Sequence, residues 1–364
     1  MNRLERYILT RTLSSVGAAL IVISAMILLV QFVDISRTIG VRADVSSGEV
    51  LGLTLLKSPS VIELLLPFVF LFGGIGAFVG LNRRSELVAM RAAGVSAWRF
   101  ISPAAWAAFI GGILAVAAID PIASTLSSRF DADRAKIMAN YLGDVPKDIW
   151  LRQGDDHTQM VIHAASRDTV NDEVRLRHVS LYIYQKNKAG QPEFKRRLEA
   201  AEAVLRPGFW QLKDVGEATA GETSVRSDSL SIRATLDTEA AVERFPSPTA
   251  IAFWKLPAAI KQTEDSGFSA AGYRLRFQQL LATPLMFAAM AVLAAAFSLR
   301  LVRLGGLAGL AGAGVGLGFA VYFFNAFTGA LGRADIIPLF AAAWAPAVVA
   351  LLSGLTLLCY TEDG

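Results

Sequence analysis

The chain has 364 residues, of which 54% are hydrophobic and 18% are charged. An average soluble domain carries about 25% charged residues, so this composition excludes an ordinary soluble protein and indicates a membrane protein. The formal net charge of +4 gives no reason to expect a nucleic-acid partner, because lysine and arginine also gather in loops beside membrane spans.

Three segments in the first third of the chain are apolar enough to cross a bilayer as helices, which takes about 20 residues each. They are residues 13–33, 61–81 and 100–119. The apolar run of the first segment is longer than the core of a signal peptide, and no A-x-A cleavage site follows it. We therefore expect this segment to remain in the protein as a span.

The sequence SELVAMRAAG, residues 85–94, lies between the second and third spans and has the pattern of a small helix. Asn82 is a suitable cap for its start, and Gly94 is a suitable stop. Arg83, Arg84 and Glu86 are expected in its first turns, and Leu87, Val88 and Met90 on its apolar side. A loop that builds its own helix here indicates a contact site, as where a membrane permease would dock a cytoplasmic motor.

A polar region at residues 124–272 separates the third span from the fourth, and we expect a soluble domain there. Residues 124–141 have the pattern of a polar helix that continues the third span. Short, partly alternating runs follow, beginning at Ile149, Gln159, Val179, Phe194, Phe209 and Ser229. This spacing predicts an antiparallel β domain, either a sandwich or a jelly roll. The only cysteine, Cys359, lies in the last span, so the domain has no disulfide.

Three more spans are expected at residues 277–299, 304–327 and 336–360. The fold class is therefore a membrane α-helical protein with six transmembrane helices (3+3) and an inserted β domain. Its domains are transmembrane helices at 1–123 with the short helix at about 82–94, the β domain at 124–272, and transmembrane helices at 273–364. G-x-x-x-G pairs in the fifth span, such as Gly314 with Gly318, let helices approach closely, either as static packing or as a seam that opens.

The distribution of lysine and arginine between the short loops predicts the orientation, because positive residues collect on the cytoplasmic side. Nine lie on the side of the short helix: Arg3, Arg6, Arg11, Arg83, Arg84, Arg91, Arg99, Arg300 and Arg303. Four lie on the opposite side: Arg37, Arg42, Lys57 and Arg333. We expect both termini and the short helix in the cytoplasm and the β domain in the periplasm.

The residues indicate no catalytic, metal or cofactor site. The chain has no Gly-Lys dipeptide and hence no P-loop, so ATP hydrolysis would have to come from a partner. Its three histidines lack the spacing of a metal pair. Asp34, Glu63 and Asp120 lie near the outer ends of spans, where we expect them to reach water. The nearly uncharged span centres argue against an ion-driven carrier.

Three groups of residues carry a resemblance to a known family. Arg83-Arg84-Ser85-Glu86-Leu87, followed by Met90 and Gly94, is similar to a cytoplasmic coupling helix. Phe32-Val33-Asp34 ends the first span, and Gly272-Tyr273-Arg274 with Pro284 surrounds the entry to the fourth. Together with the span order, these motifs resemble the LptF/LptG family, the permease halves of the bacterial lipopolysaccharide exporter. The second and third groups resemble the LptG branch more than the LptF branch.

The resemblance implies a permease subunit of an ATP-driven ABC exporter in the Gram-negative inner membrane. It implies an LptF-like paralogue beside the chain, an LptB-like ATPase dimer beneath it, and LptC with the periplasmic bridge as the next receiver of lipopolysaccharide. No active site and no cofactor of its own are implied. The residues that would couple to the ATPase are Arg83, Arg84, Glu86, Leu87, Met90 and Arg91.

The resemblance also implies a lateral gate between the first and fifth spans, beside a basic outer corner that meets lipid phosphates. Arg37 stands at one basic position of the family pattern, whereas Gln31 and Thr38 occupy two others. Arg42, Arg129 and Arg134 could supply further charge, since guanidinium groups suit phosphate. The expected apolar wall consists of Leu29, Phe32, Phe68, Phe72, Phe319 and Phe323.

Three alternatives stay open at this point. The chain could be the LptF paralogue of the same complex. It could be a membrane-anchored scaffold whose periplasmic β domain is the functional part, or a secondary carrier. Loss of the Glu86 carboxylate separates a coupled permease from an anchored scaffold, because only the scaffold should tolerate the change.

Overall fold

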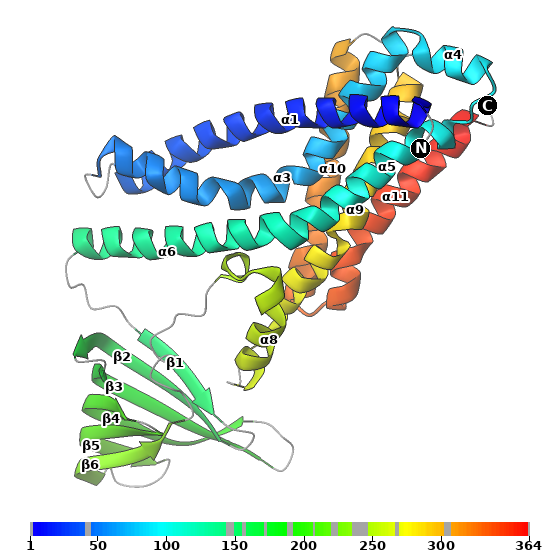
Figure 1. Ribbon diagram of the computed structural model, residues 1–364. Coiled ribbons are helices and arrows are strands. Elements are labelled where there is room, and N and C mark those ends of the chain that lie inside the picture. Colours follow the sequence, from blue (N-terminus) through cyan, green and yellow to red (C-terminus); the bar gives the residue numbers. More distant parts are fainter. Residues whose placement is uncertain are drawn as a thin grey trace. The chain divides into compact units, whose positions relative to one another are not determined.

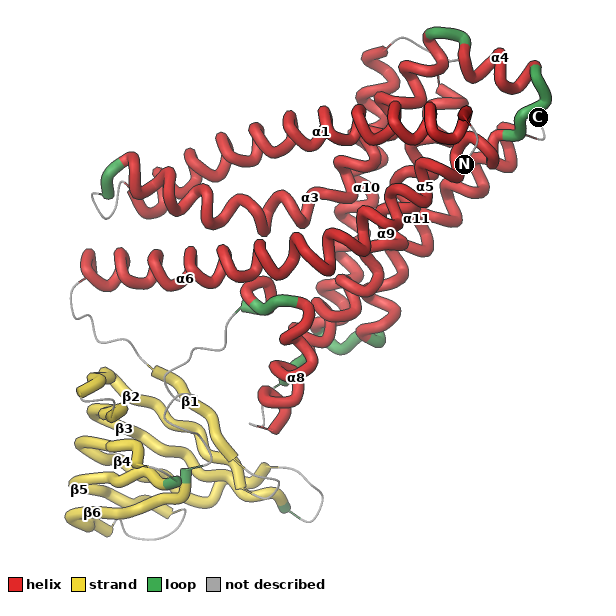
Figure 2. Tube along the Cα trace, viewed as in Figure 1, coloured by secondary structure: helices red, strands yellow, loops and turns green. Residues whose placement is uncertain are grey.

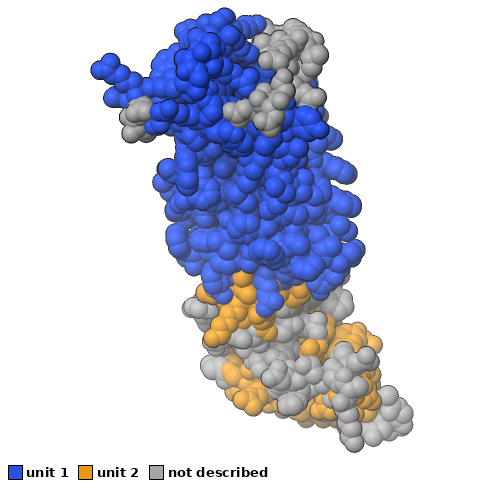
Figure 3. Space-filling model, turned by 90° about the vertical axis from the view of Figure 1, so that its right-hand side faces the viewer, with its two compact units in different colours: residues 1–141, 248–257, 271–364 blue, residues 142–247, 258–270 orange. Residues whose placement is uncertain are grey.

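The structure is a computed structural model of the chain, and its helices and strands are shown in Figures 1 and 2. It describes residues 3–40, 45–142, 149–154, 158–170, 173–187, 192–206, 208–219, 225–234, 247–265, 269–301 and 307–362. The chain forms two compact units, coloured in Figure 3. The helical unit contains residues 1–141, 248–257 and 271–364, and the β unit contains residues 142–247 and 258–270.

Six helical stretches among the described residues are long and apolar enough to cross a membrane. They are α1 (Arg3–Ile35) with the π-helical η1 (Ser36–Gly40), α3 (Ser47–Arg83), α5 (Ala97–Leu114) continued by the π-helical η2 (Ala115–Ile119) and α6 (Asp120–Leu142), α9 (Ala271–Leu301), α10 (Leu307–Arg333) and α11 (Leu339–Glu362). Three precede the sheet and three follow it, so the predicted 3+3 arrangement is confirmed. A short helix, α4 (Glu86–Ala92), lies between α3 and α5.

The central helix of this unit is α9, with 61% of the residues in its most apolar window buried. Glycines of three neighbouring helices face it. A Cβ atom added at Gly112 of α5 would lie 2.5 Å from the Cα of Pro284, and one added at Gly74 of α3 or Gly354 of α11 would lie 2.7 or 3.0 Å from a side chain of α9. Close backbone approach is a main source of helix association in lipid. These glycines therefore hold the bundle around α9.

The β unit contains one antiparallel sheet of the strands β1 (Ile149–Gly154), β2 (Thr158–Val170), β3 (Glu173–Lys186), β4 (Pro192–Arg206), β5 (Phe209–Thr219) and β6 (Val225–Arg233). All six runs predicted from the sequence are strands. Each described strand pairs with the next one in the chain, in the order β1 to β6. The predicted antiparallel β domain is therefore confirmed. Of its possible topologies, for which the sequence left a sandwich or a jelly roll open, the described strands show a meander within one sheet.

One face of the sheet supplies its core. Along β2, Met160, Ile162 and Ala164 are buried and alternate with more exposed neighbours, as the period of two in a strand requires. Trp210 of β5 is fully buried in the same cluster. The other buried members are Leu176, Val179, Leu181, Ile183, Leu198, Ala200, Ala203, Leu205, Leu212, Val215 and Ala234. The sheet is thus held by its own apolar core.

We predict that Gly112→Ala destabilises the helical unit. The new methyl group would meet backbone atoms of α9, which have no rotamer to change, and such overpacking costs about 1–3 kcal/mol. Gly52→Ala in α3 is the matched control, because nothing lies within 4 Å of the added Cβ. Alanine should there stabilise the helix by about 0.5–1 kcal/mol. The melting temperature of the purified protein should fall for Gly112→Ala and rise for Gly52→Ala. Equal shifts for the two variants would contradict the close packing of Gly112 against α9.

Candidate functional site

The start of α4 differs from the sequence prediction. Helix α3 continues through Arg83, and the backbone carbonyl of Asn82 accepts a hydrogen bond from the N–H of Ser85 at 2.9 Å. Asn82 is therefore inside α3 and does not cap α4. Ser85, at a φ of 59°, turns the chain in the left-handed region, and α4 begins at Glu86. Arg83 and Arg84 consequently end α3 and form the turn, and they are not in the first turns of α4.

The end of α4 agrees with the prediction that Gly94 stops it. Gly94 has a φ of 80°, its N–H donates to the carbonyl of Arg91 at 2.9 Å, and the N–H of Val95 donates to that of Met90 at 3.0 Å. This pair of bonds is the Schellman motif, which satisfies the last carbonyls of a helix. Only a residue that tolerates a positive φ fits this position without strain.

Leu87 fixes α4 to one end of the helix bundle. Its side chain is 1% exposed, and Met90, one turn later, packs against the same apolar cluster. We call this the α4 cluster; its buried members are Ile8, Phe78, Leu81, Leu87, Ala97, Phe100, Ile101, Ala104, Val292, Ala295, Ala296 and Leu358. It includes side chains of α1, α3, α5, α9 and α11. Val88, expected on the apolar side, is 61% exposed, because it lies off the face that Leu87 and Met90 share.

A contact that the sequence analysis missed joins α4 to α1. The hydroxyl of Tyr7 donates a hydrogen bond to Oε2 of Glu86 at 2.9 Å. The two residues are 79 positions apart, so no local pattern could have paired them. Around this bond, the side chains of Arg83 and Arg84 are exposed and that of Arg91 is half-buried. The end of the bundle that carries α4 thus presents both signs of charge.

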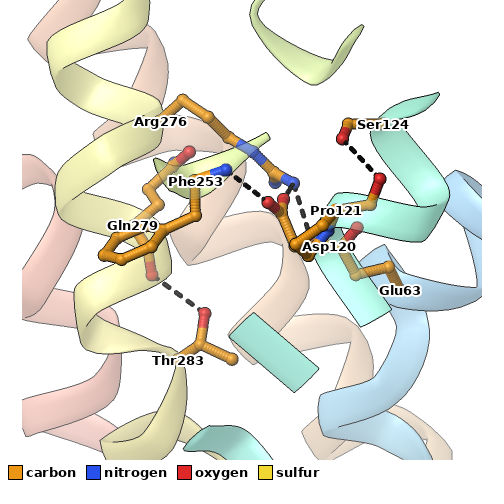
Figure 4. A network of polar contacts seen from close by, with 8 residues as sticks. All are labelled: Glu63, Asp120, Pro121, Ser124, Phe253, Arg276, Gln279 and Thr283. Carbon is orange, nitrogen blue, oxygen red and sulfur yellow. Dashed lines mark hydrogen bonds and ion pairs between the residues drawn. The ribbon is translucent and has the colours of Figure 1, made fainter. Parts of the chain in front are cut away.

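A charged network links α3, α6 and α9 (Figure 4). The Arg276 guanidinium lies 2.8 Å from Oε1 of Glu63 and 2.9 Å from Oδ1 of Asp120. Oδ2 of Asp120 accepts the backbone N–H of Phe253, in η4 (Phe253–Lys255), at 2.7 Å. The side chains of Asp120 and Arg276 are 0% and 19% exposed. The expectation that Glu63 and Asp120 reach water is therefore wrong, because helix packing encloses them and Arg276 neutralises part of their charge.

Beside this network lies a cavity of about 100 Å³. Its polar lining includes Glu63, Arg276, Gln279, Thr283 and Asn325. A drug-sized ligand needs roughly 300 Å³ or more, so this space suits water-sized groups and not an acyl chain. Among the described residues no group of three or more histidine, cysteine or acidic side chains could hold a metal ion.

The residues expected to form an apolar wall divide into two groups. Leu29, Phe319 and Phe323 are exposed, the last two by 68% and 61%. Phe32, Phe68 and Phe72 are half-buried inside the chain. Gly314 and Gly318 place α10 against α3, since Cβ atoms added there would lie 2.9 Å from Ile75 and 3.3 Å from Phe68. These glycines thus serve packing within the chain, which leaves the outer aromatic face of α10 open.

The expected basic residues gather around one apolar cluster at the other end of α1. This cluster contains Ile35 of α1 and Ile39 of η1, together with Phe130 of α6. Arg37 of η1 and Arg129 and Arg134 of α6 are exposed beside it. Arg42 lies outside the described residues. The fold therefore brings three of the four arginines to the same region.

Six spans in two groups of three, with a β unit inserted between the groups, define a multi-pass membrane protein of the permease type. Residues 6–360 match the family model of the lipopolysaccharide export system permease LptF/LptG, and the chain belongs to this family. It is 24% identical to LptG of Escherichia coli K12 over 369 residues, covering 98% of this chain and 97% of that protein. It is also 24% identical to LptG of Haemophilus influenzae Rd over 339 residues, or 90% of each chain.

We predict that Arg276→Met strongly destabilises the helical unit. The change leaves two buried carboxylates without their cation, and breaking a buried ion pair in this way costs about 3–5 kcal/mol. Arg333→Met, at an exposed arginine of α10, is the matched control and should leave the melting temperature unchanged.

The triple variant Arg276→Met/Glu63→Gln/Asp120→Asn tests the cause. It removes all three charges and keeps an acceptor for the N–H of Phe253. It should recover much of the lost stability in the same melting experiment. A triple variant as unstable as the single one would show that packing, and not charge, is responsible.

Proposed function

We propose that this chain is the permease subunit of an ATP-driven exporter that extracts lipopolysaccharide from the Gram-negative inner membrane. The observation that carries the proposal is α4, a helix of seven residues that Leu87 anchors between two spans. A partner protein that binds and moves a short helix fixed in this way would also move the spans packed against it. Membership of the lipopolysaccharide export permease family indicates lipopolysaccharide as the transported molecule.

The LptG assignment rests on two observations. Both relatives named above are LptG proteins, and each covers at least 90% of this chain. The motif Phe32-Val33-Asp34 and the residues around the entry to α9 favour the same branch. In this proposal an LptF-like paralogue is the second permease half of the complex.

The proposed orientation places α4 and both termini in the cytoplasm. Nine positive residues in the short loops at the α4 side against four at the other side support it. The β unit then lies in the periplasm. An LptB-like ATPase dimer would meet α4 from the cytoplasmic side through Arg83, Arg84, Glu86 and Arg91. Leu87 and Met90, the other two expected coupling residues, would act from inside the α4 cluster by holding the helix against the spans.

The α4 cluster gives this contact a mechanical consequence. Five spans contribute side chains to the cluster, so a displacement of α4 acts on all five at once. Packed cores shift as rigid bodies and do not deform continuously. Closure of the ATPase dimer would thereby change the space between the two permease halves and push the lipid outward.

Lipid contacts are proposed on α1 and α10. Only 6% of the residues in the most apolar window of α1 and 22% in that of α10 are buried within the chain, against 56% and 61% for α3 and α9. These two helices thus keep open faces for the paralogue and the lipid. Leu29, Phe319 and Phe323 would contact acyl chains, while Arg37, Arg129 and Arg134 would contact phosphates.

Delivery from the exporter is proposed to run through the β unit. In the meander, β1 and β6 are the edge strands, each paired on one side only among the described strands. A free sheet edge can accept a strand from another protein. LptC, with the periplasmic bridge behind it, is the proposed receiver of the lipopolysaccharide.

We predict that Glu86→Ala lowers the amount of LptB-like ATPase that copurifies with the tagged chain. Loss of one partner of a charge pair at an interface weakens binding by at least about tenfold. Asp335→Asn is the matched control, because this exposed carboxylate lies between α10 and α11, on the proposed periplasmic side. Quantitative mass spectrometry of the complex measures both. Unchanged ATPase recovery would favour the anchored scaffold.

A photo-crosslinking amino acid tests the lipid contacts. Placed at Phe319 or Phe323 in the assembled complex, it should label lipopolysaccharide before ATP is added and lose most of this labelling afterwards. The control position is Trp106, which is 64% exposed and belongs to α5, a helix outside the proposed lipid contacts on α1 and α10. Equal lipopolysaccharide labelling at all three positions would contradict a specific lipid path along α10.

A further inference from the structure

We propose that Tyr7 is a positioning residue for Glu86, holding its carboxylate in the orientation in which the ATPase binds it. This inference rests on the proposed function, because it assigns a second residue to the same docking site. It arises from one contact, the 2.9 Å hydrogen bond from the Tyr7 hydroxyl to Oε2 of Glu86. Tyr7 is not part of the short helix between the spans.

The backbone on both sides of this bond is fixed by the α4 cluster. Ile8, the residue after Tyr7, and Leu87, the residue after Glu86, are both buried in that cluster, at 0% and 1% exposure. The hydroxyl and the carboxylate therefore extend from anchored positions. A tyrosine ring has only two rotatable bonds, so little entropy is lost when its hydroxyl is held in place.

The bond leaves the carboxylate able to bind a partner. An ionised carboxylate offers about four lone-pair sites on two oxygens, and Tyr7 occupies one of them. An arginine or lysine of the ATPase can approach the remaining sites while the bond to Tyr7 persists. A side chain that is already oriented loses less freedom on binding, which strengthens docking without a new contact.

The bond also connects α1 to the proposed docking site of the ATPase. Glu86 belongs to α4 and Tyr7 to the second turn of α1. A partner that pulls on the carboxylate therefore acts on α1 directly as well as through the α4 cluster.

A double-mutant cycle tests the proposal. The complete permease is placed in nanodiscs, the purified LptB-like ATPase is titrated in, and the apparent Kd and the maximal ATPase rate are measured. Tyr7→Phe keeps the ring and removes only the hydroxyl. It should raise the Kd at least about threefold, because a Glu86 side chain that Tyr7 no longer orients must lose more freedom on binding, and it should change the maximal rate less. Tyr360→Phe is the matched control, because Tyr360 is 78% exposed near the end of α11.

The double variant Tyr7→Phe/Glu86→Ala decides the mechanism. If Tyr7 acts through Glu86, the double variant binds the ATPase no more weakly than Glu86→Ala alone. Additive losses would overturn the inference, as would a normal Kd for Tyr7→Phe when Glu86→Ala binds weakly. Normal binding by Glu86→Ala would instead overturn the proposed function. An unchanged melting temperature of Tyr7→Phe separates positioning from misfolding.

Discussion

The helical unit depends on how closely the other helices approach α9. In lipid, apolar side chains gain little by leaving one apolar surrounding for another, so close packing and polar bonds must hold helices together. Glycines of α3, α5 and α11 bring three helices against α9, and the backbone at Pro284 leaves no room for even a methyl group on Gly112. Within the helical unit, α1 packs in turn against α3, and α10 against α11.

Helix α9 also connects the apolar cluster that holds α4 to the charged network around Arg276. Towards its end it supplies Val292, Ala295 and Ala296 to the cluster that holds α4. Near its start it supplies Arg276, which binds carboxylates of α3 and α6. One helix thus joins the proposed docking site of the ATPase to the ion pairs near its opposite end.

The sequence predicted the elements well, because length and hydropathy determine spans and alternation determines strands. It failed where a residue's surroundings come from distant parts of the chain. Asp120 was expected to reach water because it ends an apolar run, but Arg276 and the N–H of Phe253 enclose it. Val88 and Leu87 look equally apolar, and only the packing of α4 separates them. Tyr7 carries no local signal at all.

The ion pairs of the helical unit join residues that are synthesised on opposite sides of the β unit. Glu63 and Asp120 are made before the β unit, whereas Arg276 is made after it. The first three spans therefore enter the membrane while both carboxylates lack their cation. The free-energy cost of these unpaired carboxylates remains until the fourth span is inserted. Arrival of α9 then closes the ion pairs together with the contacts of Gly74 and Gly112. A chain interrupted within the β unit would lack Arg276 and would leave both carboxylates without their cation.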